Sequence, residues 1–220
     1  MTEPLWAVGC YEDANGRVAW EISHEEIQRD MGSASRALAA LDVTRGDRVL
    51  FCSMLSESGQ FWPYVVGAML VGAQLSCADA NEGDAVRVAM FTRLVDYDAV
   101  LGVTGAILDG LDALQRPYAD VFGGIRVLGA RPDAYERLVT AALTPHHFVL
   151  CGPAVAVGRA PAAPAVVDGD EWAIDAHAGR VVVTSLRTRA TRFDRAPTGV
   201  CGEIIDGGVV PAVPSEARRA

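Results

Sequence analysis

The stretch of residues 44–79 constrains the fold more than any other part of the sequence. Residues 49–55 form a continuous apolar run of strand length, and such runs are typical of strands covered on both faces. Residues 61–71 then read as an apolar helix entered through Pro63, because proline is tolerated in the first turn of a helix. Residues 75–77 follow as a second short strand. This order of strand, helix and strand predicts the beginning of a layered α/β domain.

A helix with one apolar face precedes this stretch. Ser23, with Glu26 three residues later, has the signature of a capping box. The apolar residues that follow recur at spacings of three and four: Ile27, Met31, Ala34, Leu38 and Leu41. This periodicity predicts a helix that packs one stripe of side chains against a core.

Strands and helices continue to alternate after residue 79. Apolar strands are predicted at residues 99–103 and 125–128, and a helix at residues 84–95. Two more helices are expected, one capped by Thr104 and one that begins at Pro132. Such alternation predicts βαβ crossovers, and therefore an α/β fold with a mainly parallel sheet flanked by helices.

The pattern changes after residue 146. The later strands are short and separated by Asp-Gly and Ala-Gly turns, at residues 166–167, 172–174, 180–186 and 200–205. They predict a small C-terminal β-subdomain. The expected organisation is an N-terminal arm with a short hairpin at Asn15-Gly16 (residues 1–20), the α/β domain (21–150), the β-subdomain (151–210) and a flexible tail (211–220).

Charge and composition exclude several classes of function. The formal net charge of −9 opposes binding to nucleic acid or to an anionic membrane surface. All 19 basic residues are arginine, so chemistry that requires a lysine amine is not expected. The sequence has no apolar run of the roughly 18 residues that span a bilayer, and its acidic N-terminus differs from a secretory signal, so we expect a cytoplasmic protein.

The five cysteines are dispersed, without a Cys-x-x-Cys pair or a histidine at metal-ligand spacing: Cys10, Cys52, Cys77, Cys151 and Cys201. This pattern indicates free thiols and no metal site. Cys52 and Cys77 fall inside apolar strands, where burial is expected to make a thiol inert. The acidic run Asp168, Asp170 and Glu171 is interpreted as a solvated turn rather than a metal site.

Three segments resemble a known enzyme family. Residues 36–49 contain Arg36-Ala37-Leu38 and end in Gly46-Asp47-Arg48-Val49; residues 61–73 end in Gly67-Ala68 and Gly72-Ala73; and residues 179–186 read Gly-Arg-Val-Val-Val-Thr-Ser-Leu. In order and spacing they resemble the N-terminal part of the adenylate-forming (AMP-dependent) acyl- and aryl-CoA synthetases, with the third segment closest to phenylacetate-CoA ligases. The resemblance implies an α/β ligase-like domain with a cleft at the carboxyl ends of its parallel strands.

Several parts that the resemblance implies for adenylation are missing. The place of the phosphate-binding loop holds residues 104–107, the acidic magnesium ligand is absent near residues 150–154, and Val200 replaces the ribose-binding aspartate. The C-terminal domain with its catalytic lysine is also absent. We therefore expect a truncated relative that is not an autonomous ATP-dependent ligase. No cofactor is predicted: ATP and magnesium are not expected to bind, whereas a CoA thioester remains compatible.

Candidate ligand-binding residues cluster where the resemblance places the acyl and nucleotide sites: Ser56, Ser58, Phe61, Trp62, Gly152, Pro153, Arg195 and Thr198. For Phe61 and Trp62, a core or dimer-interface role is the alternative. His146, His147 and Cys151 are candidates for a Cys/His nucleophile pair. Since neighbouring residues on a strand point to opposite faces, at most one histidine can share a face with Cys151.

Three hypotheses about function follow. The chain binds an acyl, aryl or CoA-linked small molecule without activating it; or it is an interaction partner that pairs with itself or with a complete AMP-forming ligase; or it is a residual or repurposed enzyme of the family. A response to acyl ligands but not ATP favours the first, co-purification with a complete ligase favours the second, and ATP–pyrophosphate exchange favours the third.

Overall fold

The computed structural model describes residues 4–212 and has an α/β architecture. Within these residues the largest sheet has eleven strands. Its first five strands are parallel and lie in the order β4 (Gln74–Ala78), β3 (Arg48–Cys52), β5 (Ala99–Val103), β6 (Val127–Ala130) and β7 (His146–Cys151). The sheet continues antiparallel through β8 (Ala154–Gly158), β9 (Ala165–Val166), β13 (Gly208–Pro211), β12 (Ala196–Ile205), β11 (Arg180–Ser185) and β10 (Trp172–His177).

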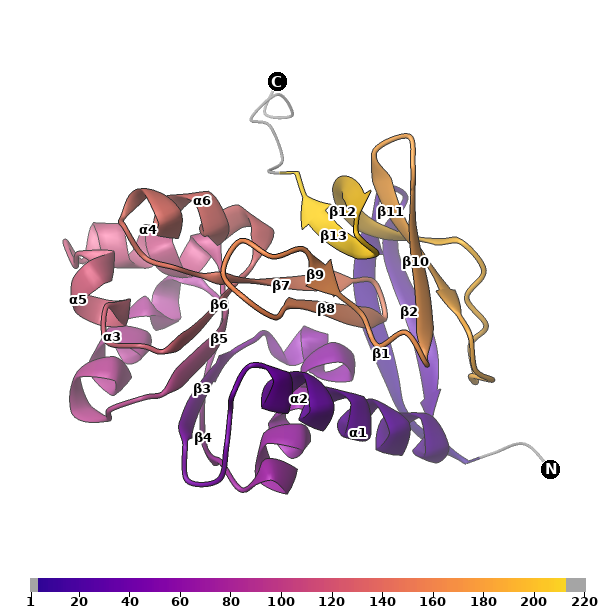
Figure 1. Ribbon diagram of the computed structural model, residues 1–220, viewed down its shortest axis with the longest axis horizontal. Coiled ribbons are helices and arrows are strands. Elements are labelled where there is room, and N and C mark those ends of the chain that lie inside the picture. Colours follow the sequence, from indigo (N-terminus) through magenta and orange to yellow (C-terminus); the bar gives the residue numbers. More distant parts are fainter. Residues whose placement is uncertain (1–3, 213–220) are drawn as a thin grey trace.

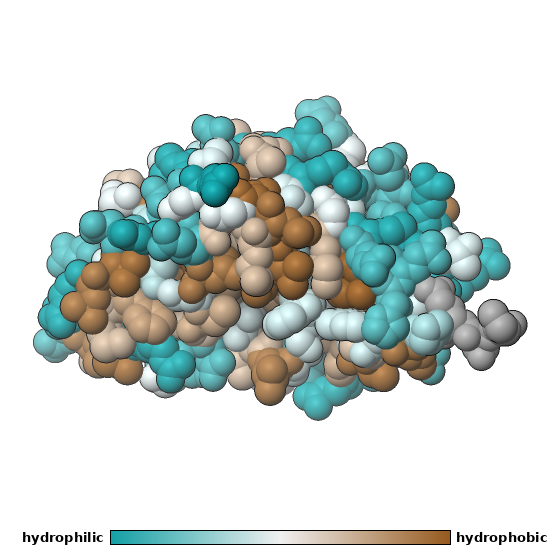
Figure 2. Space-filling view, turned by 90° about the horizontal axis from the view of Figure 1, so that it is seen from below, coloured by the Kyte–Doolittle hydropathy of each residue, from teal (hydrophilic) through white to brown (hydrophobic). Residues whose placement is uncertain are grey.

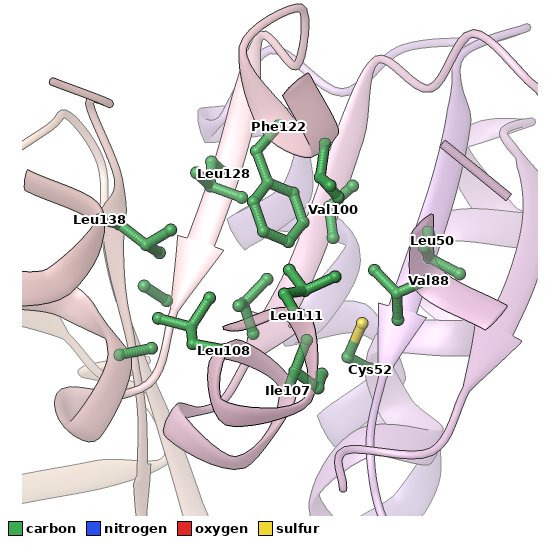
Figure 3. Packing of buried hydrophobic residues seen from close by; sticks show 14 of the residues in the cluster. Leu50, Cys52, Val88, Val100, Ile107, Leu108, Leu111, Phe122, Leu128 and Leu138 are labelled. Carbon is green, nitrogen blue, oxygen red and sulfur yellow. The ribbon is translucent and has the colours of Figure 1, made fainter. Parts of the chain in front are cut away.

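Helices cover both faces of the parallel part (Figure 1). One face carries α1 (His24–Ala40) and, after the short 3-10 turn η1 (Leu55–Glu57), α2 (Ser58–Val71). The other face carries α3 (Ala85–Leu94), α4 (Gly105–Ala113), α5 (Tyr118–Phe122) and α6 (Pro132–Thr140), with the 3-10 turn η2 (Glu82–Asp84) before α3. On this second face, leucines of α4 pack with Val100, Leu128 and Phe122 in a continuous apolar core (Figure 3).

The N-terminal residues form a long hairpin, β1 (Leu5–Asp13) and β2 (Gly16–Ser23), in place of a mainly irregular arm. The turn lies at Asn15-Gly16 as expected, with Gly16 at a φ of 121°. Tyr11 and Trp20 pack their rings together and join a core shared with the strands of the C-terminal part. The hairpin thereby connects α2 with β12.

The predicted capping box at the start of α1 is present. The Glu26 N–H donates to Ser23 Oγ (3.2 Å), and the Ser23 N–H donates to Glu26 Oε2 (2.6 Å). Ile27, Ala34 and Leu38 of the predicted stripe are buried. The apolar residues at spacings of three and four lie on one face of α1, and this face packs on the sheet. The periodicity alone therefore predicted which residues of α1 are buried.

Several boundaries differ from the prediction. The helix α2 begins at Ser58, so Pro63 lies inside it rather than in its first turn. The extra turn is stabilised by tertiary packing, since Gly59 lies directly against the Trp20 ring. β6 begins two residues later than expected, and strands β8 and β13 were not predicted at all. Residues 213–220, which belong to the predicted tail, lie outside the described residues.

The predicted burial of Cys77 is wrong. β4 is an edge strand that pairs with β3 on one side only, and the side chain of Cys77 is exposed, whereas Cys52 on β3 is fully buried. In residues 4–212, no helix combines the length and hydrophobicity required to cross a bilayer.

Candidate functional site

A cavity of about 220 Å³ lies between α1, α2, β8 and the segment of residues 166–169. We call it the α1–α2 cavity. Its inner wall is formed by buried side chains that include Ala34, Tyr64, Val157 and Trp172. Arg36 and Arg159 line it as exposed residues at its opening. Polar side chains such as Gln60 line the cavity beside these apolar groups, so it suits a small molecule that has an apolar and a polar part.

Tyr64 places a phenol hydroxyl on the inner wall, which also includes the buried side chain of Gln60. The Tyr64 side chain is only 7% exposed, and its hydroxyl has no hydrogen-bond partner among the residues that the structure describes. Burial raises the pKa of this phenol above its ordinary value, and the carboxylates of Asp168 and Asp30 raise it further. The hydroxyl therefore stays protonated and is a free donor for a ligand oxygen.

The charges at the opening differ in their partners. Arg36 forms an ion pair with Asp168. Burial opposes ionisation of Asp168, but hydrogen bonds from Ser33, from the Asp170 N–H and from Arg36 lower the pKa of this carboxyl below its ordinary value. Arg159, at the end of β8, has no ion-pair partner within residues 4–212. It is thus a free cation beside the cavity.

A buried ionic cluster holds Asp30 and Trp172, two residues of the cavity lining, in place. Arg189 donates to Asp30 Oδ1 (2.7 Å) and to Glu171 Oε2 (2.8 Å), and its guanidinium lies 4.1 Å from the centre of the Trp172 ring. Arg29 adds a bond to Glu171 (3.0 Å). The prediction of a solvated turn is wrong for Glu171, which is buried because arginines distant in sequence neutralise it. The cluster ties α1 to the strands that carry Trp172.

The residues predicted between positions 56 and 62 divide into exposed and core positions. Ser56 lies in η1 and Ser58 at the start of α2, and both are exposed. Phe61 is buried against Phe148 at 5.4 Å between ring centres, so it belongs to the core. Trp62 is exposed and lies 6.5 Å from the Trp6 ring. None of these four side chains lines the cavity.

Among the later candidates, Pro153 alone lines the α1–α2 cavity. Gly152 precedes it in a tight turn with a φ of 60°, and its carbonyl accepts a hydrogen bond from Gln60 Nε2 (3.0 Å). Thr198 is buried and donates to the Val181 carbonyl (2.8 Å), which is a structural contact. Arg195 pairs with Asp175 on the surface at 2.9 Å. The structure therefore does not bring the predicted ligand residues together.

The two histidines and Cys151 do not form a nucleophile pair. His146 Nδ1 lies 2.9 Å from the Gly158 carbonyl, and the His147 ring stacks on Tyr135 at 3.8 Å. His147 shares a strand face with Cys151 but is four residues away, which is roughly 13 Å along a strand. Burial also raises the pKa of the Cys151 thiol to about 12, so the nucleophilic thiolate is scarcely formed near neutral pH.

This burial leads to a prediction about thiol labelling. Burial raises the pKa values of both Cys52 and Cys151 to about 12. We expect iodoacetamide at pH 8 to leave both unmodified in the native protein and to label all five cysteines after unfolding. Peptide mass spectrometry would measure this. Rapid native labelling of Cys151 would instead restore it as a candidate nucleophile.

At the carboxyl ends of β3 and β6, where the resemblance placed a cleft, a partly buried ion pair is found. Arg131 donates to Glu57 Oε2 (2.8 Å), and its guanidinium lies 5.0 Å from the centre of the Phe61 ring. Neither Arg131 nor Tyr64 was among the predicted site residues. The signal that could have indicated Tyr64 is weak: it is a polar side chain within α2, a helix without charged residues. Among residues 4–212, no three His, Cys, Asp or Glu side chains lie close enough to hold a metal ion.

Comparison with known proteins identifies the fold. No protein-family sequence profile matches the chain, and no curated protein matches it by sequence. An open conformation of 2-hydroxyisobutyryl-CoA ligase, in complex with 2-HIB-AMP and CoA, matches with a TM-score of 0.68 at 13% identity, over 96% of this chain and 56% of that chain. The N-terminal subdomain of NpsA from Klebsiella oxytoca, in complex with 3-hydroxyanthranilyl-AMSN, matches with a TM-score of 0.65 at 12% identity, over 96% and 62%.

The anthranilate CoA ligase AuaEII, in complex with anthranoyl-AMP, matches with a TM-score of 0.65 at 10% identity, over 93% of this chain and 46% of that chain. The chain therefore has the fold of part of the AMP-forming acyl- and aryl-CoA ligases, and the resemblance seen in the sequence is confirmed at the level of the fold. It spans about half the length of these structures.

Proposed function

We propose that this protein binds a small acyl or aryl carboxylic acid in the α1–α2 cavity and does not itself activate the acid with ATP. The observation that carries the proposal is the free Tyr64 hydroxyl on the inner wall of a cavity that also has the free cation Arg159. A phenol donor and a guanidinium are both suited to carboxylate or carbonyl oxygens. The apolar side chains of the inner wall accommodate the acyl or aryl group.

The size of the cavity sets the class of ligand. Its volume of about 220 Å³ is below the roughly 300–1,000 Å³ of typical drug-sized sites. A benzoate-sized acid or a short acyl chain fits, whereas the nucleotide part of a CoA thioester would have to stay outside. Structures of the same fold contain adenylates of small acids, 2-HIB-AMP and anthranoyl-AMP, which supports a small acid as the ligand here.

Local structure near residues 104–107 supports the absence of activation. Thr104 caps α4, and its Oγ1 accepts the Ile107 N–H (3.3 Å). A phosphate-binding loop would need backbone N–H groups free to hold the phosphates, but here the helix begins directly after the strand. The chain also has no lysine for the developing charge of phosphoryl transfer.

A thermal-shift panel of ATP, CoA, short acyl-CoAs, short acids and aryl acids tests the proposal. A ligand that binds only the folded state at 100 times its Kd stabilises it by about 2.7 kcal/mol, which corresponds to a rise in Tm of roughly 5–10 °C for a chain of this size. We expect such a shift with aryl or short acyl acids and none with ATP. A shift with ATP alone would contradict the proposal.

Removing the Tyr64 hydroxyl tests the site itself. For Tyr64→Phe we expect the Kd of the bound acid to rise roughly tenfold or more, because a hydrogen bond to a charged group contributes about 1.5–3 kcal/mol. Isothermal titration would measure this. Tyr118→Phe is the matched control, because that hydroxyl bonds to Asp112 and Arg137 outside the cavity. Equal affinity of both variants and the wild type would place the ligand elsewhere.

A further inference from the structure

The outer edge of β4 has free backbone hydrogen-bonding groups. The Gln74 N–H donates to the Asp47 carbonyl (2.7 Å), and the Ala78 carbonyl accepts from the Ser53 N–H (3.1 Å), so these residues point toward β3. Because the direction alternates along a strand, the N–H and C=O groups of Leu75 and Cys77 point outward. In the described part of the chain, β4 is the last strand and nothing pairs with this side.

This edge lacks the features that normally protect an edge strand. Natural edges are shielded by charged side chains, proline, bulges or a covering segment. The sequence of β4 is Gln-Leu-Ser-Cys-Ala, with no charge and no proline, and its register with β3 is regular over all five residues. A regular, uncharged edge of this kind is a template for another strand.

Apolar side chains also remain exposed on the two helices that flank β4 along the chain. The helix α2 has no charged residue, and near its end it exposes Met69 and Leu70. The helix α3 exposes Val86, Met90 and Leu94 at a spacing of four. These five side chains are between 41% and 66% exposed. Figure 2 views the molecule from below, on the side of β4 in Figure 1, and shows hydrophobic residues gathered on the left and in the middle of this face.

We propose that this edge is a homodimer interface, in which β4 pairs antiparallel with β4 of a second copy of this chain. The partner has to cover both the free strand edge and the exposed apolar side chains of the two helices. A single peptide strand would satisfy Leu75 and Cys77 but would leave the stripes of α2 and α3 exposed. Another three-layer sheet edge covers the strand and both helices, and a second copy provides that edge by two-fold symmetry.

Charge favours this face over the others for contact between two copies. Each copy has a formal charge of −9, so two copies repel each other at long range. A face whose strand and helix α2 have no charged side chain is where two such molecules meet with the smallest repulsion. Because salt screens this repulsion, the dimer should become stronger as ionic strength rises.

Sedimentation equilibrium of the full chain tests the proposal. We expect the wild type to have twice the monomer mass of 23.3 kDa, with a Kd that falls as salt is added. Cys77→Lys places a charge on the edge, and since its side chain is exposed the variant should fold and weaken the dimer at least tenfold. Met69→Lys, which leaves the strand unchanged, should also weaken it.

Leu186→Lys is the matched control, because it introduces the same charge at an exposed leucine away from β4. It should remain as dimeric as the wild type. Protection of Cys77 from iodoacetamide should increase as the protein concentration passes the Kd. A wild type that stays monomeric at all concentrations, or a dimer that survives both lysine substitutions at β4 and α2, would overturn the proposal. Neither result would affect the test of acid binding.

Discussion

Arg189→Ala should lower the free energy of unfolding by about 3–5 kcal/mol, the cost of removing one partner from a buried ion pair. The side chain of Arg189 is only 3% exposed and bonds to Asp30 and Glu171. Without the guanidinium, the buried carboxylate of Glu171 retains Arg29 alone as its cationic partner. The contact with the Trp172 ring is lost as well. Urea unfolding followed by circular dichroism would measure the change.

Two further variants separate charge from packing. Arg189→Met keeps an apolar stem against Trp172, so a loss close to that of Arg189→Ala would assign the effect to the charge. Arg17→Ala is the control, because its pair with Glu12 is exposed and such pairs contribute about 0–1 kcal/mol. An Arg189→Ala variant as stable as Arg17→Ala would show that the ionic cluster does not hold α1 to the C-terminal strands.

Phe61→Ala should also cost about 3–5 kcal/mol, as is usual when a buried phenylalanine is truncated. Phe61 is 2% exposed and packs against Phe148 and Phe51. Its ring also covers the guanidinium of Arg131. Truncation therefore removes apolar contacts from the core and exposes the buried guanidinium of Arg131. Urea unfolding is again the measurement.

The neighbouring residue is the matched control. Trp62 is 44% exposed and its ring faces Trp6, so Trp62→Ala should change the free energy of unfolding by about 1 kcal/mol or less. Both variants should be compared at one protein concentration, because association adds to apparent stability. If Trp62→Ala proved the more costly substitution, the assignment of Phe61 to the core would be wrong.

Local patterns explain which parts of the fold could be predicted. The capping box of Ser23 and Glu26 and the apolar stripe behind it depend on residues three or four positions apart, and the structure confirms both. The strand at residues 99–103 could be predicted from its own five residues, because a continuous apolar run indicates burial on both faces, and all five are buried. Pro63 shows the limit, because its position inside α2 depends on packing against the distant β1–β2 hairpin.

The cavity could not be predicted because its walls join distant segments. Tyr64 and Asp168 are distant in sequence but line the same cavity. Asp30, which also lines it, is bonded to Arg189, 159 residues away in the sequence. The resemblance predicted a cleft at the carboxyl ends of the strands, where Arg131 and Glu57 instead form a partly buried ion pair. A resemblance in sequence can indicate where a family's site would lie. Whether side chains fill that site or leave it open depends on contacts between segments distant in sequence.

The cavity and the β4 edge lie on different parts of the molecule and can be tested separately. The cavity is lined by the beginning of α2, including Gln60 and Tyr64, whereas the exposed stripe includes Met69 and Leu70 near its end. One helix thus contributes to both surfaces. Acid binding that depends on protein concentration would indicate that α2 couples them.

The most direct test of the central claim is a titration of the wild type with the carboxylic acid that binds most tightly in the thermal-shift panel. The titration is done with and without ATP and magnesium, while pyrophosphate release is monitored. Binding without activation predicts the same Kd in both titrations and no pyrophosphate. Binding that requires ATP, or release of pyrophosphate with the acid, would show that this chain retains the activity of the ligases whose fold it has.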